Sequence, residues 1–557
     1  MKEMEQSKNI NKKRKEGSFY TPKLFVNYAH KMIEETLGED WKERYVVWDN
    51  CCGIGNLTKD YCFKELYAST LHQSDIDIVR QYNKDTTQKF QFDFLNDPIE
   101  YPNSLFGDYT DKLPKGLKDA FLNDKPIMFF INPPYATGCN IGTQSGGKAG
   151  TNDTMIRKIM HDEDLGSGAE NIQHQFLYRI CNLKETFNLT NIHICLFSNP
   201  IFLTGERQKD FLKYFCNHFS FNKGIMFQAS EFANVSKSWG ITFNIWNCGK
   251  NKDNNNFIHT LIESEGETIY EKGQKNLYNV WNDVLANKWV RKELKNTKYN
   301  IEIPCVCNAL KIKEPKRELL TNNNSIGYFH NNANSIRYND LYVGMYSTPF
   351  ASAHGVVIIH ENYEKCISLF SARKLIKGNW INSKDEYLAP DETNPKYNEF
   401  INDSIVYSLF HSSSNQSSLR QIEYKEKKWD IYNEFFWMSK AEIMQLANDN
   451  NFSECYNDAR TSKDRYVYKK LQTITLSAEA QAVLDKANEI VRNTFKYRGM
   501  FGSEHPEYQI MNWDCGWYQI KALAKEYKKS EYDEFSILFK KLEEKMRPMV
   551  YELGFLK

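Results

Sequence analysis

Residues 126–135 of this 557-residue chain read Pro-Ile-Met-Phe-Phe-Ile-Asn-Pro-Pro-Tyr, an apolar run that stops at two prolines. The apolar residues 127–131 predict a β-strand buried on both faces, because turn residues bound them and no polar residue alternates with them. Pro133 and Pro134 end this strand and stiffen the turn that follows it. A rigid turn at the carboxyl end of a buried strand is where open α/β sheets hold their ligands.

The turn itself offers three groups that suit one kind of ligand. Asn132 presents an amide, Pro133 a backbone carbonyl oxygen and Tyr135 an aromatic ring. The two oxygens can accept both N–H bonds of an exocyclic amino group, while the heterocycle that carries this group stacks on the tyrosine. The tetrapeptide therefore predicts a site for a planar, amino-bearing heterocycle.

The composition describes a folded protein of two or three domains. Hydrophobic residues make up 41% of the chain and aromatic residues 14%, so the chain can bury substantial cores. The formal net charge of +1 gives no overall basic field, and any phosphate-binding surface must be local. The 13 cysteines form no CxxC pair, which favours reduced thiols in a cytoplasmic protein over a metal site. No run of 18 apolar residues occurs, so no membrane span is predicted.

Strand-like and helix-length segments alternate over residues 17–250, which predicts an α/β domain with a mainly parallel, doubly wound, Rossmann-like sheet. The strand-like runs are residues 46–48, 68–73, 89–94, 127–131, 192–198 and 241–246. Residues 138–170 are rich in Gly, Ser and Asn and predict a long loop directly after the tetrapeptide, in the position of a lid.

Composition also divides the rest of the chain. Residues 1–16 form a charged N-terminal tail, and the polar run 251–256 predicts a domain boundary. Residues 257–470 predict a mixed α+β region, and residues 471–557 a helical end. Helical apolar spacing is found over residues 477–494 and 520–553.

A glycine-rich turn follows the strand predicted at residues 46–48. Its sequence, Asp49-Asn50-Cys51-Cys52-Gly53-Ile54-Gly55, would let a ligand approach the backbone closely, although a lone G-x-G is more often a plain turn. Asp75 ends the next strand and can hold the two ribose hydroxyls of a nucleoside cofactor. Asp77 is instead expected to cap the following helix.

Two shorter segments complete the set. Asp93 can accept the amino group of an adenine ring on which Phe94 packs, although such an aspartate is more often a turn or cap residue. Residues 17–22, Gly-Ser-Phe-Tyr-Thr-Pro, precede an amphipathic helix predicted over residues 23–37. They could form a lid over a small ligand or only a helix start. Each of the five segments lies at a predicted strand end or helix start, and this shared placement favours a common site.

These segments together resemble the S-adenosylmethionine-dependent N6-adenine DNA methyltransferases of gamma-type motif order, in which the tyrosine- and threonine-containing segment comes first and the recognition domain last. The resemblance covers roughly residues 17–250. Asn132, Pro133, Pro134 and Tyr135 match the family without change, and Asn50 stands where its glycine-rich motif has proline. The other matching residues are Gly17, Tyr20, Thr21, Pro22, Asp49, Cys52, Gly53, Gly55, Asp75, Asp93 and Phe94.

The resemblance implies direct methyl transfer from S-adenosylmethionine to N6 of an adenine that is flipped out of double-stranded DNA. Asn132 and Pro133 would accept the two N–H bonds of the amino group, and Tyr135 would stack on the base. Phe243 or Trp239 would cover its other face, unless they are ordinary strand core. Direct transfer needs no covalent enzyme intermediate, so no cysteine is assigned a catalytic role. The residues assigned to the cofactor are Tyr20, Thr21, Pro22, Asp49, Cys52, Gly53, Gly55, Asp75, Asp93 and Phe94.

By the same resemblance, residues 17–250 form the catalytic domain and residues 257–470 the DNA target-recognition domain. Two basic and aromatic stretches in this second half are candidate DNA contacts, although each could also be a solvated face. The candidate residues are Arg373, Lys374, Lys377, Lys427 and Lys428. We expect a monomeric, cytoplasmic, stand-alone enzyme that acts beside a separate restriction endonuclease, with no metal.

Other functions stay open at the level of sequence. The tetrapeptide also resembles enzymes that methylate cytosine N4, guanine N2 in structural RNA or a glutamine side chain of protein. A degenerate core that only binds DNA is a further alternative, and the intact Asp49, Gly53, Gly55 and Asn132 argue against it. A dehydrogenase is disfavoured because the glycine-rich turn lacks the full G-x-G-x-x-G pattern.

Overall fold

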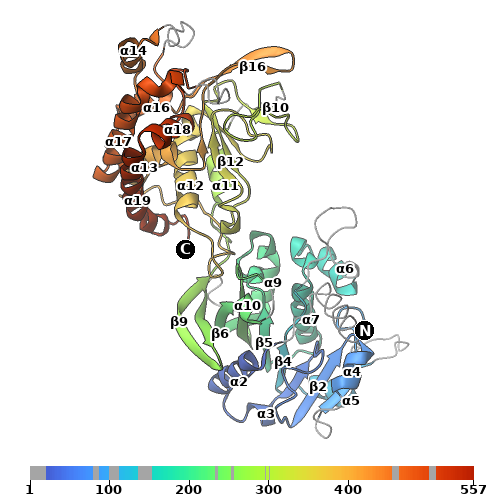
Figure 1. Cartoon of the computed structure of the whole chain (residues 1–557). Coiled ribbons are helices and arrows are strands. Elements are labelled where there is room, and N and C mark those ends of the chain that lie inside the picture. The colour runs from blue at the N-terminus through green and yellow to red at the C-terminus, as the bar shows by residue number, and fades with distance from the viewer. Residues whose placement is uncertain are drawn as a thin grey trace, which may run out of the picture. The chain divides into compact units, whose positions relative to one another are not determined.

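The chain forms two compact units, shown in Figure 1. Unit 1 comprises Met1–Trp281 with Asn379–Asp385, and unit 2 comprises Asn282–Gly378 with Glu386–Lys557. The computed structural model describes residues 21–79, 87–99, 112–135, 154–232, 236–251, 256–294, 297–299, 302–453, 463–500 and 510–557.

Unit 1 is built around one nine-stranded sheet with the strand order β3-β2-β1-β4-β5-β7-β6-β8-β9. β7 and β9 run antiparallel to their neighbours, and the other strands share one direction. The order reverses between β1 and β4, so the chain winds outward in both directions from this point. The strands are β1 (Val46–Asp49), β2 (Glu65–Thr70), β3 (Thr87–Gln91), β4 (Ile127–Ile131), β5 (Ile192–Ser198), β6 (Phe219–Gln228), β7 (Gly240–Cys248), β8 (Phe257–Glu265) and β9 (Thr268–Leu277).

Helices cover both faces of this sheet. They are α2 (Lys23–Leu37), α3 (Trp41–Arg44), α4 (Gln73–Val79), α5 (Lys115–Leu122), α6 (Met155–Asp162), α7 (Ile172–Thr186), α8 (Ile201–Thr204), α9 (Lys209–His218), α10 (Ala229–Phe232) and the 3-10 helices η1 (Gly166–Glu170) and η2 (Glu206–Gln208). In β4, Phe129 belongs to the core formed with α5 and α7, and Phe130 to the core formed with α2 and α3. Burial on both faces explains why every residue of β4 is apolar. The predicted mainly parallel, doubly wound α/β fold is confirmed.

The segment after β2 differs from the sequence-based prediction. β2 ends at Thr70, and the strand predicted to continue to residue 73 gives way to α4, which begins at Gln73. Asp77 lies inside α4 and accepts a hydrogen bond from the side chain of Gln73 at 3.0 Å. The prediction that Asp77 caps this helix is therefore wrong, because the helix begins one turn earlier.

The long loop predicted over residues 138–170 is helical in its described part. Residues 154–170 contain α6 and η1, while residues 136–153 lie outside the described residues. α6 begins where it does because the Thr154 hydroxyl accepts the backbone N–H of Arg157 at 3.0 Å. The loop prediction is wrong for this part.

The chain leaves unit 1 after Trp281, and not at residues 251–256 where the sequence predicts a boundary. That polar run joins β7 to β8, and β8 pairs in parallel with β6. β8 and β9 then form a hairpin that extends the same sheet. The compact unit is therefore longer than the domain predicted over residues 17–250.

Unit 2 is a mixed α+β body, as predicted, with a four-stranded sheet of order β14-β12-β13-β15. Its strands are β10 (Lys298–Tyr299), β11 (Leu320–Thr321), β12 (Gly327–Asn331), β13 (Val343–Tyr346), β14 (Val356–Ile358), β15 (Ser414–Asn415), β16 (Leu419–Tyr424) and β17 (Lys427–Ile431). Its α-helices are α11 (Ala286–Arg291), α12 (Tyr363–Leu375), α13 (Tyr397–Phe410), α14 (Lys440–Asp449), α16 (Tyr466–Leu471), α17 (Ala478–Thr494), α18 (Trp517–Tyr527) and α19 (Lys529–Glu552), and its 3-10 helices are η3 (Ile336–Tyr338), η4 (His360–Asn362) and η6 (Phe495–Met500).

The helical end of the chain shares one hydrophobic core with the rest of unit 2. This core contains side chains from Ala286 to Leu556, so residues 257–470 and 471–557 do not form separate compact units. The helical spacing over residues 520–553 corresponds to two helices, α18 and α19, that meet at Lys528. Among the described residues, no helix is both long and apolar enough to cross a membrane.

Candidate active site

β1 and β4 bring two of the predicted motifs to one edge of the sheet. The strands pair in parallel, with Trp48 opposite Phe129. Because both strands end at the same edge, the turn after Asp49 and the turn that begins at Asn132 emerge side by side. This edge lies where the strand order reverses, which is the position at which open α/β sheets bind ligands.

Cys51 links these two turns. The backbone N–H of Asn132 donates a hydrogen bond to its sulfur, and Tyr135 lies within electrostatic range of it. Burial raises the pKa of the Cys51 thiol well above its ordinary value, and the neighbouring Asp49 raises it further. The thiol therefore stays protonated and is a poor nucleophile.

The side chain of Asn132 is held at both ends. Its amide nitrogen Nδ2 donates to the Thr21 hydroxyl at 3.0 Å, and its oxygen Oδ1 accepts from the Tyr135 hydroxyl at 2.7 Å. Thr21 is buried, whereas Asn132 and Tyr135 are half-buried. Burial raises the pKa of Tyr135 well above its ordinary value, so its hydroxyl stays protonated at neutral pH. Tyr20, the preceding candidate, lies outside the described residues.

The glycine-rich turn requires glycine at two positions. Gly53 has φ +51° and Gly55 has φ +80°, conformations that other residues adopt only with strain. The backbone N–H of Gly55 donates to the carbonyl of Cys52 at 2.7 Å, which closes the turn tightly. A Cβ atom at Gly53 would meet no atom within 4 Å, so the backbone here borders open space that a ligand can enter.

Two polar side chains beside this turn are buried without full hydrogen bonding. Asp49 is 1% exposed; its Oδ1 lies 3.4 Å from the backbone nitrogen of Cys51, and its Oδ2 has no partner. Burial raises the pKa of Asp49 to about 8, an effect that the Cys51 N–H opposes. Asn50 is also 1% exposed, and neither atom of its amide has a partner. Buried polar groups are rarely left unsatisfied, so the two oxygens fit a bound ligand that carries donors or positive charge, and Nδ2 of Asn50 fits an acceptor on that ligand. The family resemblance gives Asn50 no role, because Asn50 stands where the motif has proline.

The remaining cofactor candidates lie near the same edge. Asp75 is half-buried in the first turn of α4. The Asp93 carboxylate accepts the backbone N–H groups of Leu95 at 3.0 Å and Asn96 at 3.2 Å, so it closes its own turn. Phe94 is buried, and its ring is stacked on that of Phe176 with the centroids 5.2 Å apart. Among the described residues, no three His, Cys, Asp or Glu side chains are grouped to hold a metal.

Pro22 ends the segment that leads into α2. Its carbonyl accepts the backbone N–H groups of Phe25 and Val26, each at 3.1 Å, and so starts the helix. The alternative interpretation of this segment as a helix start thus holds for Pro22, while the preceding Thr21 reaches Asn132.

Phe243 does not face the candidate site. It is fully buried in β7, which lies between β5 and β6, and its ring packs against Phe197 and Phe130 at centroid distances of 4.7 and 6.2 Å. The prediction that Phe243 stacks on a substrate base is therefore wrong. Trp239, the other candidate, precedes β7 and is half-buried.

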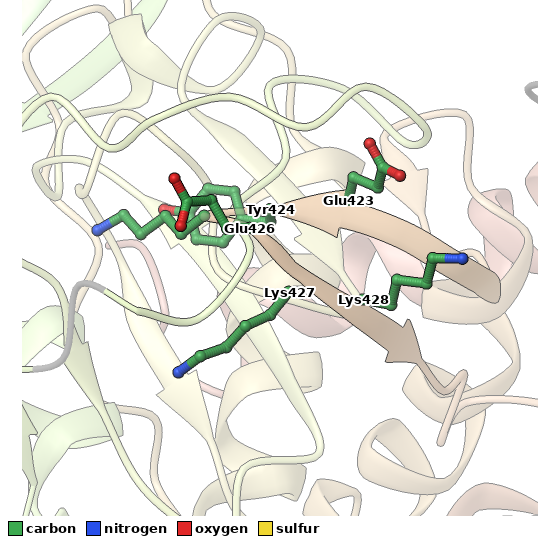
Figure 2. A pocket seen from close by; sticks show the side chains of 6 residues that line it. Glu423, Tyr424, Glu426, Lys427 and Lys428 are labelled. Carbon is green, nitrogen blue, oxygen red and sulfur yellow. The ribbon is translucent and has the colours of Figure 1, made fainter.

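In unit 2, Lys427 and Lys428 lie on the β16–β17 hairpin and are exposed. Because they are consecutive strand residues, their side chains leave opposite faces of the hairpin, as Figure 2 shows. The two-residue turn is formed by Lys425 and Glu426, with φ +50° and +61°, where glycine or asparagine is usual. Residues 423–428 line an open hollow of about 410 Å³ at this tip. Lys425, the first residue of the same basic stretch, adds a third exposed cation at this tip.

The other basic stretch lies at the end of α12. Lys377 is exposed. Lys374 is half-buried, and its Nζ donates to the carbonyl of Asn339 at 2.6 Å. Burial lowers the pKa of Lys374 to about 8. Lys374 is therefore already engaged within unit 2.

Arg373 is fully buried and forms hydrogen bonds within unit 2. Its guanidinium donates to the side-chain oxygens of Asn339, at 3.0 Å, and Asn331, and to the carbonyls of Ala333, at 2.6 Å, and Ser335, at 3.2 Å. Burial lowers its pKa to about 10, so it stays charged at neutral pH. The prediction that Arg373 contacts DNA is wrong, because its donors are used to hold the loop after β12.

Arg373→Ala is expected to lower the free energy of unfolding by about 3 kcal/mol or more, because four buried oxygens lose a charged donor. Chemical denaturation followed by fluorescence measures this change. Lys377→Ala, at the same end of α12 but exposed, is the control and should change stability by less than about 0.5 kcal/mol. A loss of DNA affinity in Arg373→Ala with unchanged stability would contradict the internal role.

Comparisons with known proteins found no matching family model and no matching curated sequence. Among solved structures, the chain is similar to one titled as the cryo-EM structure of a DrdV–DNA complex, with 13% identity over 48% of this chain and a TM-score of 0.31. It is also similar to a type I restriction-modification methyltransferase subunit from Streptococcus thermophilus, with 15% identity over 46% of this chain and a TM-score of 0.30. A modification subunit of a putative type I restriction enzyme from Vibrio vulnificus YJ016 matches over 51% of this chain, with 11% identity and a TM-score of 0.28. The chain spans 29%, 51% and 57% of these three chains, and similarities of this size carry no argument about its function.

Proposed function

We propose that this chain is an S-adenosylmethionine-dependent methyltransferase that methylates the N6 amino group of adenine in double-stranded DNA. The observation that carries the proposal is the convergence of the Asn132-Pro133-Pro134-Tyr135 turn and the Asp49–Gly55 turn at the point where the strand order reverses. The family resemblance of these motifs supplies the chemistry, and their placement at one edge supports it.

The residues at this edge fit the proposed cofactor. When bound, S-adenosylmethionine supplies an electrophilic methyl group on a sulfonium. The unpartnered Oδ2 of Asp49 would take its positively charged amino group, and the open space at Gly53 lets the ligand approach the backbone. Asp75 would hold the ribose hydroxyls. Asn50, with both amide atoms unpartnered, would hydrogen bond to the same ligand.

The tetrapeptide would act on the acceptor nitrogen. Oδ1 of Asn132 and the carbonyl of Pro133 accept its two N–H bonds, which makes the nitrogen lone pair more available. These bonds strengthen as positive charge develops on the nitrogen, so they stabilise the transition state more than the ground state. Tyr135 stacks on the base, which has to leave the duplex to reach this turn.

The β16–β17 hairpin is a candidate DNA contact in unit 2. A two-stranded ribbon fits the major groove, and lysines on both of its faces can meet the phosphates on both walls. We expect Lys427→Ala with Lys428→Ala to weaken DNA binding for all sequences and to reduce the slope of log affinity against log salt by about 2. Titrations at several salt concentrations measure this slope.

The matched control for the hairpin is Lys540→Ala with Lys541→Ala. Both lysines are exposed on α19 of the same unit, so the net charge changes equally. The same loss of slope in both double variants would mean that only overall charge matters, and the hairpin would then have no specific role.

Incubation of the protein with methyl-labelled cofactor and, in separate reactions, unmethylated genomic DNA, RNA or protein, followed by mass spectrometry of the nucleosides or peptides, tests the proposed function. We expect labelled N6-methyladenine. Label in N4-methylcytosine, in RNA or in protein would refute adenine as the acceptor and keep the cofactor. An absence of label in all four, together with no cofactor binding in calorimetry, would refute the enzyme and favour a degenerate core.

A further inference from the structure

The acceptor oxygen of Asn132 is already occupied in the protein without substrate. Oδ1 accepts the Tyr135 hydroxyl at 2.7 Å, and this oxygen is the one that the proposed function gives to the substrate amino group. At the other end of the amide, Nδ2 donates to the hydroxyl of Thr21 at 3.0 Å. Three side chains therefore form one chain of hydrogen bonds, with the amide between two hydroxyls.

Thr21 directly precedes a helix that is packed on the core. The Pro22 carbonyl starts α2 by accepting two backbone N–H groups. In the first turn of α2, Phe25 is 1% exposed and is stacked on Phe227 of β6, with ring centroids 4.0 Å apart. Thr21, which is 5% exposed, thus gives Asn132 a fixed partner from a segment 111 residues away.

We infer that Thr21 is a positioning residue that fixes the amide plane of Asn132, and that the Tyr135 hydroxyl is a placeholder which the substrate amino group displaces. This inference rests on the proposed function. It also reassigns Thr21, which by family resemblance would bind the cofactor.

The reason for the first role is the freedom of an amide side chain. Its last torsion is broad and roughly two-fold, so an unanchored asparagine can turn its Nδ2 toward the acceptor nitrogen, where two donors would meet. The hydroxyl of Thr21 holds one end of the amide and limits this rotation. A hydroxyl is needed for this, and a methyl group of the same size is not sufficient.

The reason for the second role is the cost of an empty acceptor. A half-buried oxygen that loses water without gaining a donor is unfavourable, so Tyr135 satisfies it until the substrate arrives. The substrate amino group then exchanges one hydrogen bond for another, while the aromatic ring stays available for stacking. Because the Tyr135 hydroxyl competes with the substrate amino group for Oδ1 of Asn132, it weakens substrate binding.

Steady-state kinetics of Thr21→Val and Thr21→Ser test the positioning role. We expect Thr21→Val to lower kcat by about a hundredfold, the size of effect seen when one group that stabilises a transition state is lost. Thr21→Ser, which keeps the hydroxyl, should retain at least about a third of kcat. Calorimetry should show equal cofactor affinity in both variants, and a selective loss of that affinity with kcat preserved would overturn the inference.

Tyr135→Phe tests the placeholder role. It keeps the ring and removes the competing donor, so we expect KM for DNA to fall about two- to tenfold, the equivalent of one neutral hydrogen bond, with kcat changed little. A large rise in KM or a large fall in kcat would overturn this role, because the hydroxyl would then help the bound substrate.

A spectroscopic measurement separates this inference from the proposed function. The ¹³Cζ resonance of Tyr135 in tyrosine-labelled protein, assigned by its loss in Tyr135→Phe, reports whether the hydroxyl donates a hydrogen bond. We expect it to move in Asn132→Ala and in Thr21→Val, and to stay in place in Thr21→Ser. An unchanged chemical shift in Asn132→Ala and Thr21→Val would refute the hydrogen-bonded chain. An absence of methyl transfer by the wild-type protein would refute the proposed function alone.

Discussion

Asn132→Ala is expected to lower the rate of methyl transfer by about 10²–10³-fold while the affinity for S-adenosylmethionine stays the same. The variant loses the one side-chain oxygen that the tetrapeptide offers to the acceptor nitrogen, and the Pro133 carbonyl cannot replace it. Four of the cofactor candidates lie in the Asp49–Gly55 turn, and the substitution leaves this turn intact. Single-turnover kinetics with labelled cofactor measure the rate, and calorimetry measures the affinity.

Asn123→Ala is the matched control. Asn123 is an exposed residue that ends α5, just before β4 begins, and so lies at the opposite end of the strand from Asn132. Its amide donates only to the carbonyl of Asp119 among the contacts seen, within the same turn. It should transfer methyl groups at the wild-type rate. A wild-type rate in Asn132→Ala itself would refute the mechanism, and the tetrapeptide would then be only a structural turn.

The sequence predicts the strands best where burial is complete. Every residue of β4 is apolar because the strand is covered on both faces, so a run of apolar residues gives its position directly. The apolar pattern does not predict β6, because Asn222, Lys223 and Gly224 interrupt its apolar residues at a register irregularity opposite β7. The pattern of apolar residues does not predict a strand that forms because of its pairing with a neighbouring strand rather than because of its residue types.

Some features of the candidate site can likewise be predicted from the sequence, and others depend on tertiary packing. Strand ends can be predicted, so the convergence of the Asp49 and Asn132 turns follows from a parallel sheet. The contact between Thr21 and Asn132 joins residues 111 positions apart and depends on how α2 packs, which no spacing reveals. The sequence does not place Phe243 correctly, because an apolar strand residue faces the core or a ligand according to its neighbours, and those of Phe243 are Phe130 and Phe197 of the core.

Arg373 lies in a helix that is covered on nearly every side, because ten of the 13 residues of α12 are buried. A basic side chain inside such a helix has to be satisfied internally, whereas the exposed Lys377 lies beyond the end of the helix. Local basic charge is therefore a poor guide to DNA contacts where the surrounding helix is largely buried.

Asp49→Asn is expected to weaken cofactor binding by at least about a hundredfold and, at the same time, to stabilise the cofactor-free protein at neutral and alkaline pH. Loss of the carboxylate leaves the positive amino group of the cofactor without its partner, which costs at least about a hundredfold in affinity. Binding by the wild-type protein at pH 7 should also release a proton, because Asp49, with its pKa near 8, ionises when the cation arrives. Calorimetry in buffers of different ionisation enthalpy measures both effects.

The stability effect has a definite sign. The pKa of Asp49 is about 8 in the folded protein and 3.8 in its ordinary range, so between these values the folded state keeps a proton that the unfolded chain has released. The unfolding free energy of the wild-type protein therefore falls as pH rises from about 4 to about 8, by up to about 1.4 kcal/mol per pH unit from this group. Asparagine cannot ionise, and Asp49→Asn should gain stability over the wild type across this window and keep the gain above it.

Denaturant unfolding of both proteins at pH 5 and pH 8 measures the difference, and Asp124→Asn provides a control of opposite sign. A hydrogen bond from the Thr190 hydroxyl lowers the pKa of Asp124, so its contribution to stability is present above the ordinary pKa and is lost as pH falls. Asp124→Asn should thus be less stable than the wild type at both pH values.

Equal stability of Asp49→Asn and the wild type at pH 8 would mean that burial does not destabilise the ionised Asp49, and its unpartnered oxygen would then no longer support a site for a cation. A stabilised variant that no longer binds the cofactor would instead show that the protein keeps this buried carboxylate for binding at the expense of stability.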